Sequence, residues 1–195
     1  FTDDDKDNFL SKKVNLGLDL QGGSYLLLEV DSSPVIKQKL QSKILSIKNY
    51  LKDSKIKYEK LKISENSINF NINAVDIETF EEFFKNKNNS INAYYNKYRD
   101  YEMLYSINNN IVKIEFSKFG LIEIKNSTLE QSLEIVRRRI DELGTKDPTI
   151  IKRGNDRILV ELPGLEDPNR IKKLLGKTAN LTFRLVSETE NTFGS

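Results

Sequence analysis

The chain has 195 residues and a mass of 22.6 kDa, enough for one large domain or two small ones. It contains no cysteine and no histidine, which excludes disulfides, thiolate zinc sites, cysteine nucleophiles and the commonest general base. The net charge is +2 and no apolar run approaches the length of a membrane helix, so these residues indicate neither a uniformly basic nucleic-acid binder nor a membrane span.

The first residues are acidic and are followed by a strand. Four aspartates lie before Asn8, which indicates a linker rather than a folded element. From Val14 apolar residues alternate, pause at Gly22-Gly23, and resume over 25–30. This pattern predicts a strand with a glycine kink or bulge. A phosphate cradle at these glycines is disfavoured, because no Walker spacing or basic residue accompanies them.

Residues 34–118 show an α+β pattern. Apolar residues three or four positions apart predict a helix from Pro34 to about 50–53. Alternation on both sides of Glu65-Asn66 predicts a hairpin, and a second helix is expected over 77–84. A second hairpin, with strands 101–107 and 111–116, is expected to turn at Asn108-Asn109-Asn110 because asparagine tolerates positive φ. The predicted order is αββαββ.

The strongest helical pattern covers residues 128–143. Ser127 and Glu130 form a candidate capping box, and Gly144 is expected to end the helix. One apolar stripe runs along it, formed by Leu129, Leu133, Val136, Ile140 and Leu143. Ile135 lies off this stripe, and we expect it to be covered by an inserted lobe or by a partner.

The remaining elements are short. Strands at 150–151 and 158–160 are expected to form a hairpin that turns at Gly154-Asn155. Asp167 is expected to cap a short helix that starts at Pro168 and ends at Gly176. A final strand is predicted over 181–185.

The element order contains the pattern βαββαβ, which places the chain in the α+β class. Two arrangements fit it. Either two such units follow in tandem and meet at 108–110, or the first strand completes a sheet with the C-terminal elements and leaves 34–118 as an inserted lobe. Periodicity alone does not choose between them.

Charged and aromatic clusters have structural explanations that we favour. Nine lysines in 37–62 are typical of a solvated helix face rather than a membrane-binding patch. Arginines 137–139 have acidic neighbours within helical reach at Glu134, Asp141 and Glu142. Five tyrosines in 94–105 fit core packing as well as a stacking platform for nucleic acid. We find no triad, carboxylate pair or metal cluster, so no catalytic residue, metal ligand or cofactor site is expected.

Two blocks of sequence resemble the SecD family of protein-export membrane proteins. The first, residues 16–23, reads LGLDLQGG and resembles the family's LGLDLxGG signature. The second begins with VRRRIDELG at 136–144 and continues in family order to Arg184. Departures are Gln21, where arginine is common, and Asp147, where glutamate is usual. The resemblance gives a structural role to Gly17, Leu18, Asp19, Leu20, Gly22, Gly23, Arg137, Arg139, Gly144, Pro148, Gly154, Arg157, Leu162, Pro163, Gly164, Phe183 and Arg184.

The resemblance favours the inserted arrangement. It implies a ferredoxin-like (βαββαβ) base of a first periplasmic domain, made of residues 14–31 and 127–186. Residues 34–118 correspond to a variable inserted α+β lobe of αββαββ pattern. Residues 1–13 are expected to be an acidic linker that follows a membrane helix outside this sequence, and 187–195 the start of a truncated head or a flexible tail.

The resemblance also implies a function. The chain is expected to be a fragment of an inner-membrane subunit, on the periplasmic side, acting as a non-enzymatic structural and transmission module without a cofactor. Implied partners are SecF, the SecYEG channel and the exported preprotein, which the missing head mainly contacts; nucleic acid is not expected. Export would be driven by the proton gradient.

Two other classes of function fit the sequence less well. A tandem RRM-like RNA-binding module requires aromatic, glycine-rich strands, which 111–116 and 157–162 do not supply. An acylphosphatase-like enzyme requires an arginine in the loop after its first strand, where this chain has Ser32-Ser33-Pro34.

Overall fold

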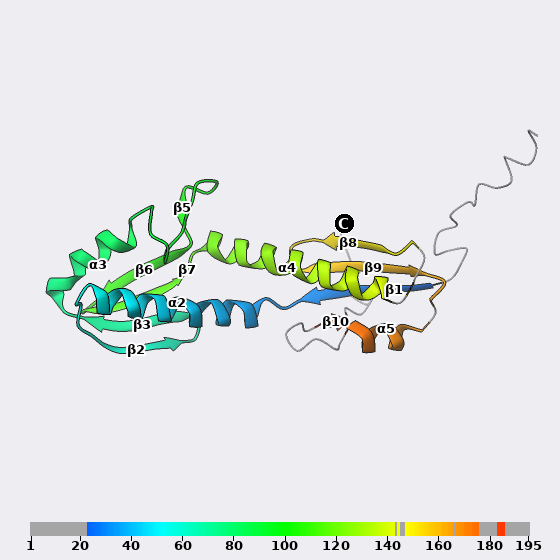
Figure 1. Cartoon of the computed structure of the whole chain (residues 1–195), viewed down its shortest axis with the longest axis horizontal. Helices are drawn as coiled ribbons and strands as arrows, with labels where there is room; N and C mark the ends of the chain where they lie inside the picture. The colour runs from blue at the N-terminus through cyan, green and yellow to red at the C-terminus, as the bar shows by residue number, and fades with distance from the viewer. Residues whose placement is uncertain (1–22, 143, 145–146, 166, 176–182, 186–195) are drawn as a thin grey trace, which may run out of the picture. The chain divides into compact units, whose positions relative to one another are not determined.

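A computed structural model describes residues 23–142, 144, 147–165, 167–175 and 183–185 (Figure 1). The chain is of mixed α and β structure, and its strands form three antiparallel sheets. It divides into two compact units. We call Phe1–Val30 with Ser132–Ser195 the split unit, and Asp31–Gln131 the central unit.

The sheet of the split unit has the strand order β10-β1-β9-β8. Its strands are β1 (Gly23–Val30), β8 (Thr149–Arg153), β9 (Arg157–Pro163) and β10 (Phe183–Leu185). β1 lies between β9 and β10, antiparallel to both. Residues before 31 therefore share a sheet with residues after 148, and this is the strand pairing that the inserted arrangement requires.

Alternation along β1 sets its register. Leu26, Leu28 and Val30 are buried, whereas the residues between them are more exposed. Leu26 is the register partner of Val160, and Leu28 that of Ile158, both of which are fully buried. A shift of one residue would move this whole apolar set to the opposite face, so burial fixes the pairing. The hairpin turn between β8 and β9 is confirmed, with Gly154 at φ +69°.

Helix α4 covers Lys118–Asp141, so the expectation that it starts after Ser127 is wrong. Ser127 is exposed within the helix, and the cap is Ser117, whose Oγ accepts the N–H of Gly120 at 2.9 Å. The capping-box pattern is local, whereas burial of Ile124 in the core of the central unit favours continuing the helix toward its N-terminus. The boundary between the units at 131–132 falls within α4.

Other expectations for the helices are confirmed. The stripe residues of α4 with a described position are buried: Leu129, Leu133, Val136 and Ile140. Gly144 has φ +66° and donates its N–H to the Asp141 carbonyl, which ends the helix. Asp167 Oδ1 accepts the Asn169 N–H at 2.9 Å and caps α5 (Pro168–Leu175). Ile135 is half-buried, and its cover by another lobe or a partner stays a prediction.

The central unit contains a second sheet, of strand order β2-β3-β7-β6. The two helices and two hairpins predicted for this region are confirmed, but the strand expected over 101–107 starts only at Met103, because Tyr101 belongs to a short hairpin of β4 and β5 that was not predicted. The elements are α2 (Ser33–Asp53), β2 (Tyr58–Ser64), β3 (Ser67–Ile72), the 3-10 turn η2 (Ala74–Asp76), α3 (Ile77–Phe84), β4 (Tyr94–Tyr95), β5 (Asp100–Tyr101), β6 (Met103–Asn108) and β7 (Ile111–Phe116).

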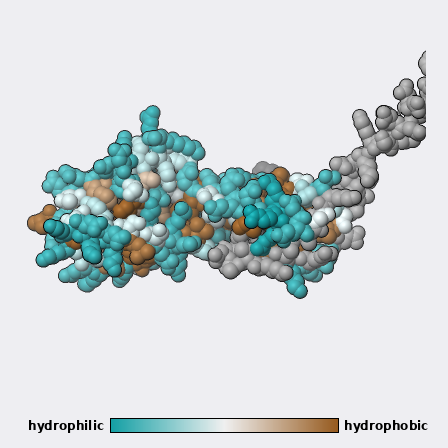
Figure 2. Space-filling model, viewed as in Figure 1, coloured by the Kyte–Doolittle hydropathy of each residue, from teal (hydrophilic) through white to brown (hydrophobic). Residues whose placement is uncertain are grey.

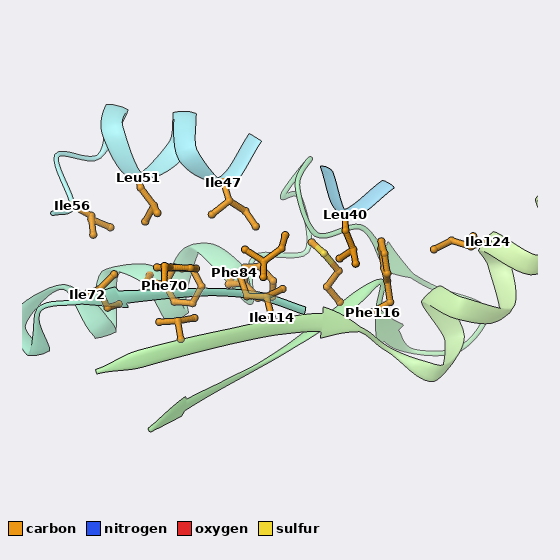
Figure 3. Close-up of a cluster of buried hydrophobic side chains, with 14 residues drawn as sticks. Leu40, Ile47, Leu51, Ile56, Phe70, Ile72, Phe84, Ile114, Phe116 and Ile124 are labelled. Carbon is orange, nitrogen blue, oxygen red and sulfur yellow. The ribbon is translucent and has the colours of Figure 1, made fainter. Parts of the chain in front are cut away.

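The core of the central unit lies between its helices and one face of this sheet. Ile47 and Leu51 of α2 point toward Phe70 and Ile114 of the sheet, and Leu40 lies beside Phe116 (Figure 3). Phe80 and Phe84 of α3 belong to the same buried cluster. Each such side chain contributes about 1.5–3 kcal/mol to the free energy of unfolding when it is buried, so this cluster contributes strongly to the stability of the central unit. The visible surface is largely hydrophilic over both units (Figure 2).

Several expectations concern residues outside the described ranges. These are the acidic linker 1–13, the strand portion 14–20 with Gly17, Leu18, Asp19 and Leu20, then Gly22, Leu143, Gly176, Leu181 and the segment 187–195. The backbones of Phe183 and Arg184 belong to β10.

Candidate functional site

The two motif blocks meet where β1 begins and β9 ends. Gly23 is the register partner of Pro163. The neighbouring Ser24 is buried, and its Oγ donates a hydrogen bond of 2.6 Å to the carbonyl of Leu165, 141 positions along the chain. Gly164, between Pro163 and Leu165 in the sequence, has φ +73°, a conformation that favours glycine. This junction fixes the first block against the exit of β9.

Proline at the last position of β9 suits this junction. Pro163 has no N–H to donate, and proline in sheets is restricted to edges and strand ends. The chain then turns, and the Leu165 N–H reaches the Leu162 carbonyl at 3.4 Å. Leu162 itself is fully buried and is the register partner of Ser24. The motif sequence of 162–164 therefore ends the strand while its first residue anchors it in the core.

The other end of β1 places an acidic residue between two arginine positions of the neighbouring strands. Glu29 has Arg157 as its register partner on β9 and Arg184 as its register partner on β10. Opposite charges at directly paired positions favour the register. The Arg157 Nε also lies 3.6 Å from Asp156 Oδ1 in an exposed pair, and the Asp156 carbonyl accepts the Val30 N–H at 2.6 Å.

The two motif arginines of α4 have different environments. Arg137 pairs with Glu134 at 2.7 Å in an exposed contact, as expected for a solvated helix face. Arg139 instead donates from Nη1 to the carbonyl of Leu175 at 2.5 Å. Leu175 is the last residue of α5, so a cation meets the carbonyl end of that helix, where the helix dipole is negative. Arg139 therefore links the two helices of the split unit.

The remaining motif residues lie at turns and ends. Gly144 ends α4, Gly154 lies in the turn between β8 and β9, and the half-buried Pro148 immediately precedes β8. Each of these residues lies where the backbone turns or where a helix or strand begins or ends.

Sequence reasoning missed a buried ion pair in the central unit. The interpretation of the lysines in 37–62 as a solvated helix face is wrong for Lys43. Its Nζ lies 2.5 Å from Glu102 Oε2 and donates to the Ile91 carbonyl at 2.5 Å. The side chains are 18% and 9% exposed, so the pair is shielded from solvent. No local pattern signals this pair, because its partners are 59 positions apart.

Glu102 is also tied through its backbone. Its N–H donates to the Ala93 carbonyl at 2.7 Å, and its carbonyl accepts the Ser117 N–H at 2.9 Å. Gly120 of α4 packs against the same carbonyl, so closely that a Cβ there would overlap its oxygen. The Glu102 backbone thus contacts the segment before β4, the residue that caps α4, and α4 itself.

The buried Asn92 follows Ile91, whose carbonyl binds Lys43. The Asn92 side chain accepts the Met103 N–H at 2.8 Å and donates to the carbonyls of Met103 and Phe84 at 3.1 and 3.2 Å. These contacts satisfy both the donor and the acceptor of its amide. They hold the segment before β4 against the start of β6.

The tyrosines of 94–105 take part in packing within the central unit. Tyr98 stacks on Phe119 with ring centroids 4.5 Å apart and donates to Glu123 Oε1 at 2.7 Å. Tyr105 packs edge-on against Phe80 and Phe84 at 5.8 and 5.4 Å. Rings engaged in this way are not free to stack on bases, which favours the packing interpretation.

One tyrosine has a strongly shifted pKa. Burial and, to a smaller extent, the nearby carboxylates of Glu102 and Glu123 together raise the pKa of the Tyr95 phenol to about 12. A phenol with a pKa this high stays protonated at neutral pH, so it offers no base for catalysis.

The structure also bears on metal binding and on membrane crossing. Among the described residues, no three carboxylates lie close enough together to hold a metal ion. None of the helices in this part of the chain combines the length and apolar character that crossing a membrane requires.

Both ends of the split unit match known family models. Residues 129–188 match the model described as protein translocase subunit SecDF, P1 domain, N-terminal. Residues 9–34 match the SecD/SecF GG motif. These are the two segments that pair as neighbouring strands in the sheet of the split unit.

The chain is also similar to curated proteins named protein translocase subunit SecD. It is 37% identical to the one from Rickettsia conorii over 178 residues, 91% of this chain and 32% of the relative. Identity is 34% for that of Pseudomonas aeruginosa, over 91% of this chain and 27% of the relative, and 30% for that of Calditerrivibrio nitroreducens, over 93% and 34%. The chain thus spans about a third of the length of these relatives. No solved structure matches it.

Proposed function

The chain belongs to the SecD family of protein translocase subunits, and we propose that it forms the base region of the first periplasmic domain of such a subunit. In this role it assists the export of unfolded polypeptides through the SecYEG channel, together with SecF and driven by the proton gradient. The subunit resides in the inner membrane, with these residues on the periplasmic side.

We further propose a ferredoxin-like base of residues 14–31 and 127–186, with 34–118 as an inserted α+β lobe. The strand order β10-β1-β9-β8 supports this, because every neighbouring pair is antiparallel and the order along the chain is strand, helix, two strands, helix, strand once the lobe is left out.

The observation that carries the proposal is the junction of the motif blocks. Gly23 of the first block and the adjoining Ser24 are tied to Pro163 and Leu165 of the second block by strand pairing and by the Ser24 hydrogen bond. A segment held on both sides within a sheet moves with that sheet, so a pull at its N-terminal end acts on the whole base. This supports a structural and transmission role rather than catalysis.

The site residues fit such a role. Arg139 links α4 to the end of α5, and Glu29 has arginine register partners on both neighbouring strands. We assign these residues, together with the motif glycines and prolines, to shaping and closing the base. None of them requires a substrate, cofactor or metal for this work.

The test is export in cells depleted of their own SecD and supplied with the full-length protein that contains this chain. We expect wild type to restore processing of a signal-peptide reporter and Val160→Asp to fail, because Val160 is fully buried in the sheet. The matched control is Ile151→Asp on the neighbouring strand, where the side chain is 47% exposed.

Failure of wild type to restore export would refute the proposed role in translocation. Restoration by Val160→Asp at wild-type protein level would refute the proposed role of the base sheet in it.

A further inference from the structure

The two edges of the central sheet differ in how they are protected. At the β2 edge, Lys60 and Lys62 are exposed, the register with β3 shifts between Glu59 and Lys62, and Lys60 has φ +54°. Edge charges and a bulge are the features that prevent a sheet from pairing with another chain. The β2 edge is therefore closed to strand addition.

The opposite edge, β6, has none of these features. Its sequence, MLYSIN, contains no charge and no proline, and it pairs with β7 in unbroken register from Met103 to Asn108. Leu104 is 46% exposed, and Ser106 and Asn108 are also exposed. A regular, uncharged edge of this kind is a template for another strand.

The hairpin turn determines which backbone groups face this edge. The loop between β6 and β7 consists of Asn109 and Asn110, both at positive φ, which makes Asn108 and Ile111 a hydrogen-bonded pair. Since such pairs alternate along an antiparallel ladder, the N–H and C=O groups of Tyr105 and Ile107 point away from β7.

Met103 points to the same edge, but its N–H and C=O are already bound by the Asn92 amide. Within the described ranges, no such partner occupies the outward backbone groups of Tyr105 or Ile107. The side chain of Asn92 shows how a strand would bind there, because its amide presents a carbonyl and an N–H as a peptide group does.

We propose that the β6 edge binds an extended segment of another polypeptide, which adds to the central sheet as a strand at Tyr105 and Ile107. An extended peptide backbone offers donors and acceptors at the two-residue repeat that these groups require. Asn92 limits the bound segment at one end and the 109–110 turn limits it at the other. The inference depends on this edge alone and not on the role proposed for the split unit.

Charge on α3 favours a different polypeptide over a second copy of this chain. Two β6 strands paired about a two-fold axis would form one continuous sheet, with both α3 helices on the same side. Ring contacts of Phe80 and Phe84 with Tyr105 place α3 over β6. This helix carries Glu78, Glu81 and Glu82, and Lys85 at its end offsets only Glu81, with which it pairs at 3.0 Å, so the helix stays negative and the two copies would repel. For the same reason, the edge fits a segment with lysine or arginine at alternating positions.

The test uses the intact chain and a short synthetic peptide that alternates valine with lysine. Amide hydrogen exchange is measured by NMR with and without the peptide. We expect slower exchange at the Tyr105 and Ile107 amides on binding. The same peptide, N-methylated at alternate residues, keeps its side chains but loses the donors, and should bind at least about tenfold more weakly, a loss of about 1.4 kcal/mol.

Ile107→Pro provides a matched variant. Because the Ile107 N–H points outward, proline there removes an edge donor without removing a bond to β7. Peptide affinity should fall at least about tenfold, whereas Ile107→Val should bind as wild type does. Thermal unfolding of each variant verifies that the central unit is folded.

The proposal is overturned if the peptide does not bind, if it binds without protecting these two amides, or if the N-methylated peptide binds equally well. Protection of the same amides by dimerisation of the chain, detected by analytical ultracentrifugation without peptide, would also overturn it in favour of a second copy.

Discussion

Gly120 and Glu102 pack backbone against backbone, with no room for a Cβ between them. In a solvated helix, alanine in place of glycine stabilises by about 0.5–1 kcal/mol. At this position the added methyl group would overlap the Glu102 carbonyl oxygen, and the neighbouring atom is backbone rather than a flexible side chain. We therefore predict that Gly120→Ala lowers the free energy of unfolding by about 1–3 kcal/mol. Urea unfolding measures this, and Lys125→Ala, at an exposed position of the same helix, is the control.

The Lys43–Glu102 pair predicts a second outcome. Because both side chains are largely shielded, Lys43→Met or Glu102→Gln alone should lower the free energy of unfolding by about 1–3 kcal/mol. The double variant should lose less than the sum, since neither partner is then left buried alone. Urea unfolding of the four proteins gives the coupling energy. Strict additivity would show that the pair does not stabilise the fold.

The position of the helix cap gives a third prediction. Ser117→Ala should cost about 0.5–2 kcal/mol, because its Oγ accepts the Gly120 N–H and also donates to the Tyr101 carbonyl at 2.6 Å. Ser127→Ala should change stability by less than about 0.5 kcal/mol, since Ser127 is exposed in mid-helix. Thermal melting compares the two variants. The reverse order of effects would place the start of the helix where the sequence pattern suggested.

The stripe on α4 predicts a fourth effect. Ile140 is fully buried, and Ile140→Ala should destabilise the protein by about 2–5 kcal/mol through lost apolar contact and the cavity left behind. Ile151→Ala removes the same atoms from a side chain that is 47% exposed and should cost much less. Equal melting temperatures for the two variants would contradict the assignment of Ile140 to the core.

Tyr95 predicts a pH effect at high pH. Burial raises its pKa from 10.0 to about 12 in the folded protein, whereas the phenol of the unfolded chain ionises near its ordinary pKa. The folded state therefore holds this proton longer. Its contribution to stability is complete below pH about 10 and is lost as the pH rises through about 12.

Spectrophotometric titration of tyrosinate measures the effect. We expect a component with a midpoint near pH 12 in wild type that is missing from Tyr95→Phe. If the titration curves of the two proteins share that last component, the environment assigned to Tyr95 is wrong.

Most elements follow from local patterns, and the reasons are visible in particular residues. The spacing of Leu40, Ile47 and Leu51 predicted α2, and these residues are the ones that face the sheet. Positive φ at Asn109 and Asn110 matches the turn expected from their tolerance of that conformation. Gly144 and Asp167 end and start helices as their chemistry predicts.

Contacts between distant residues could not be predicted in this way. The cap at Ser117 depends on a helix stabilised by burial of Ile124, and the Lys43–Glu102 pair depends on α2 lying beside the residue that joins β5 to β6. Lys43 is one of nine lysines in its region, and nothing local distinguishes it.

The sequence by itself determined most of the helices, strands and turns and, through its two motif blocks, the family to which the chain belongs. These properties depend on near neighbours along the chain, whose periodicity and turn chemistry act locally. Only the tertiary structure decided which distant strands pair, because β1 finds β9 and β10 across a long intervening segment through apolar burial that no short window contains. The same holds for the uncovered edge of β6, which exists only because the sheet ends there.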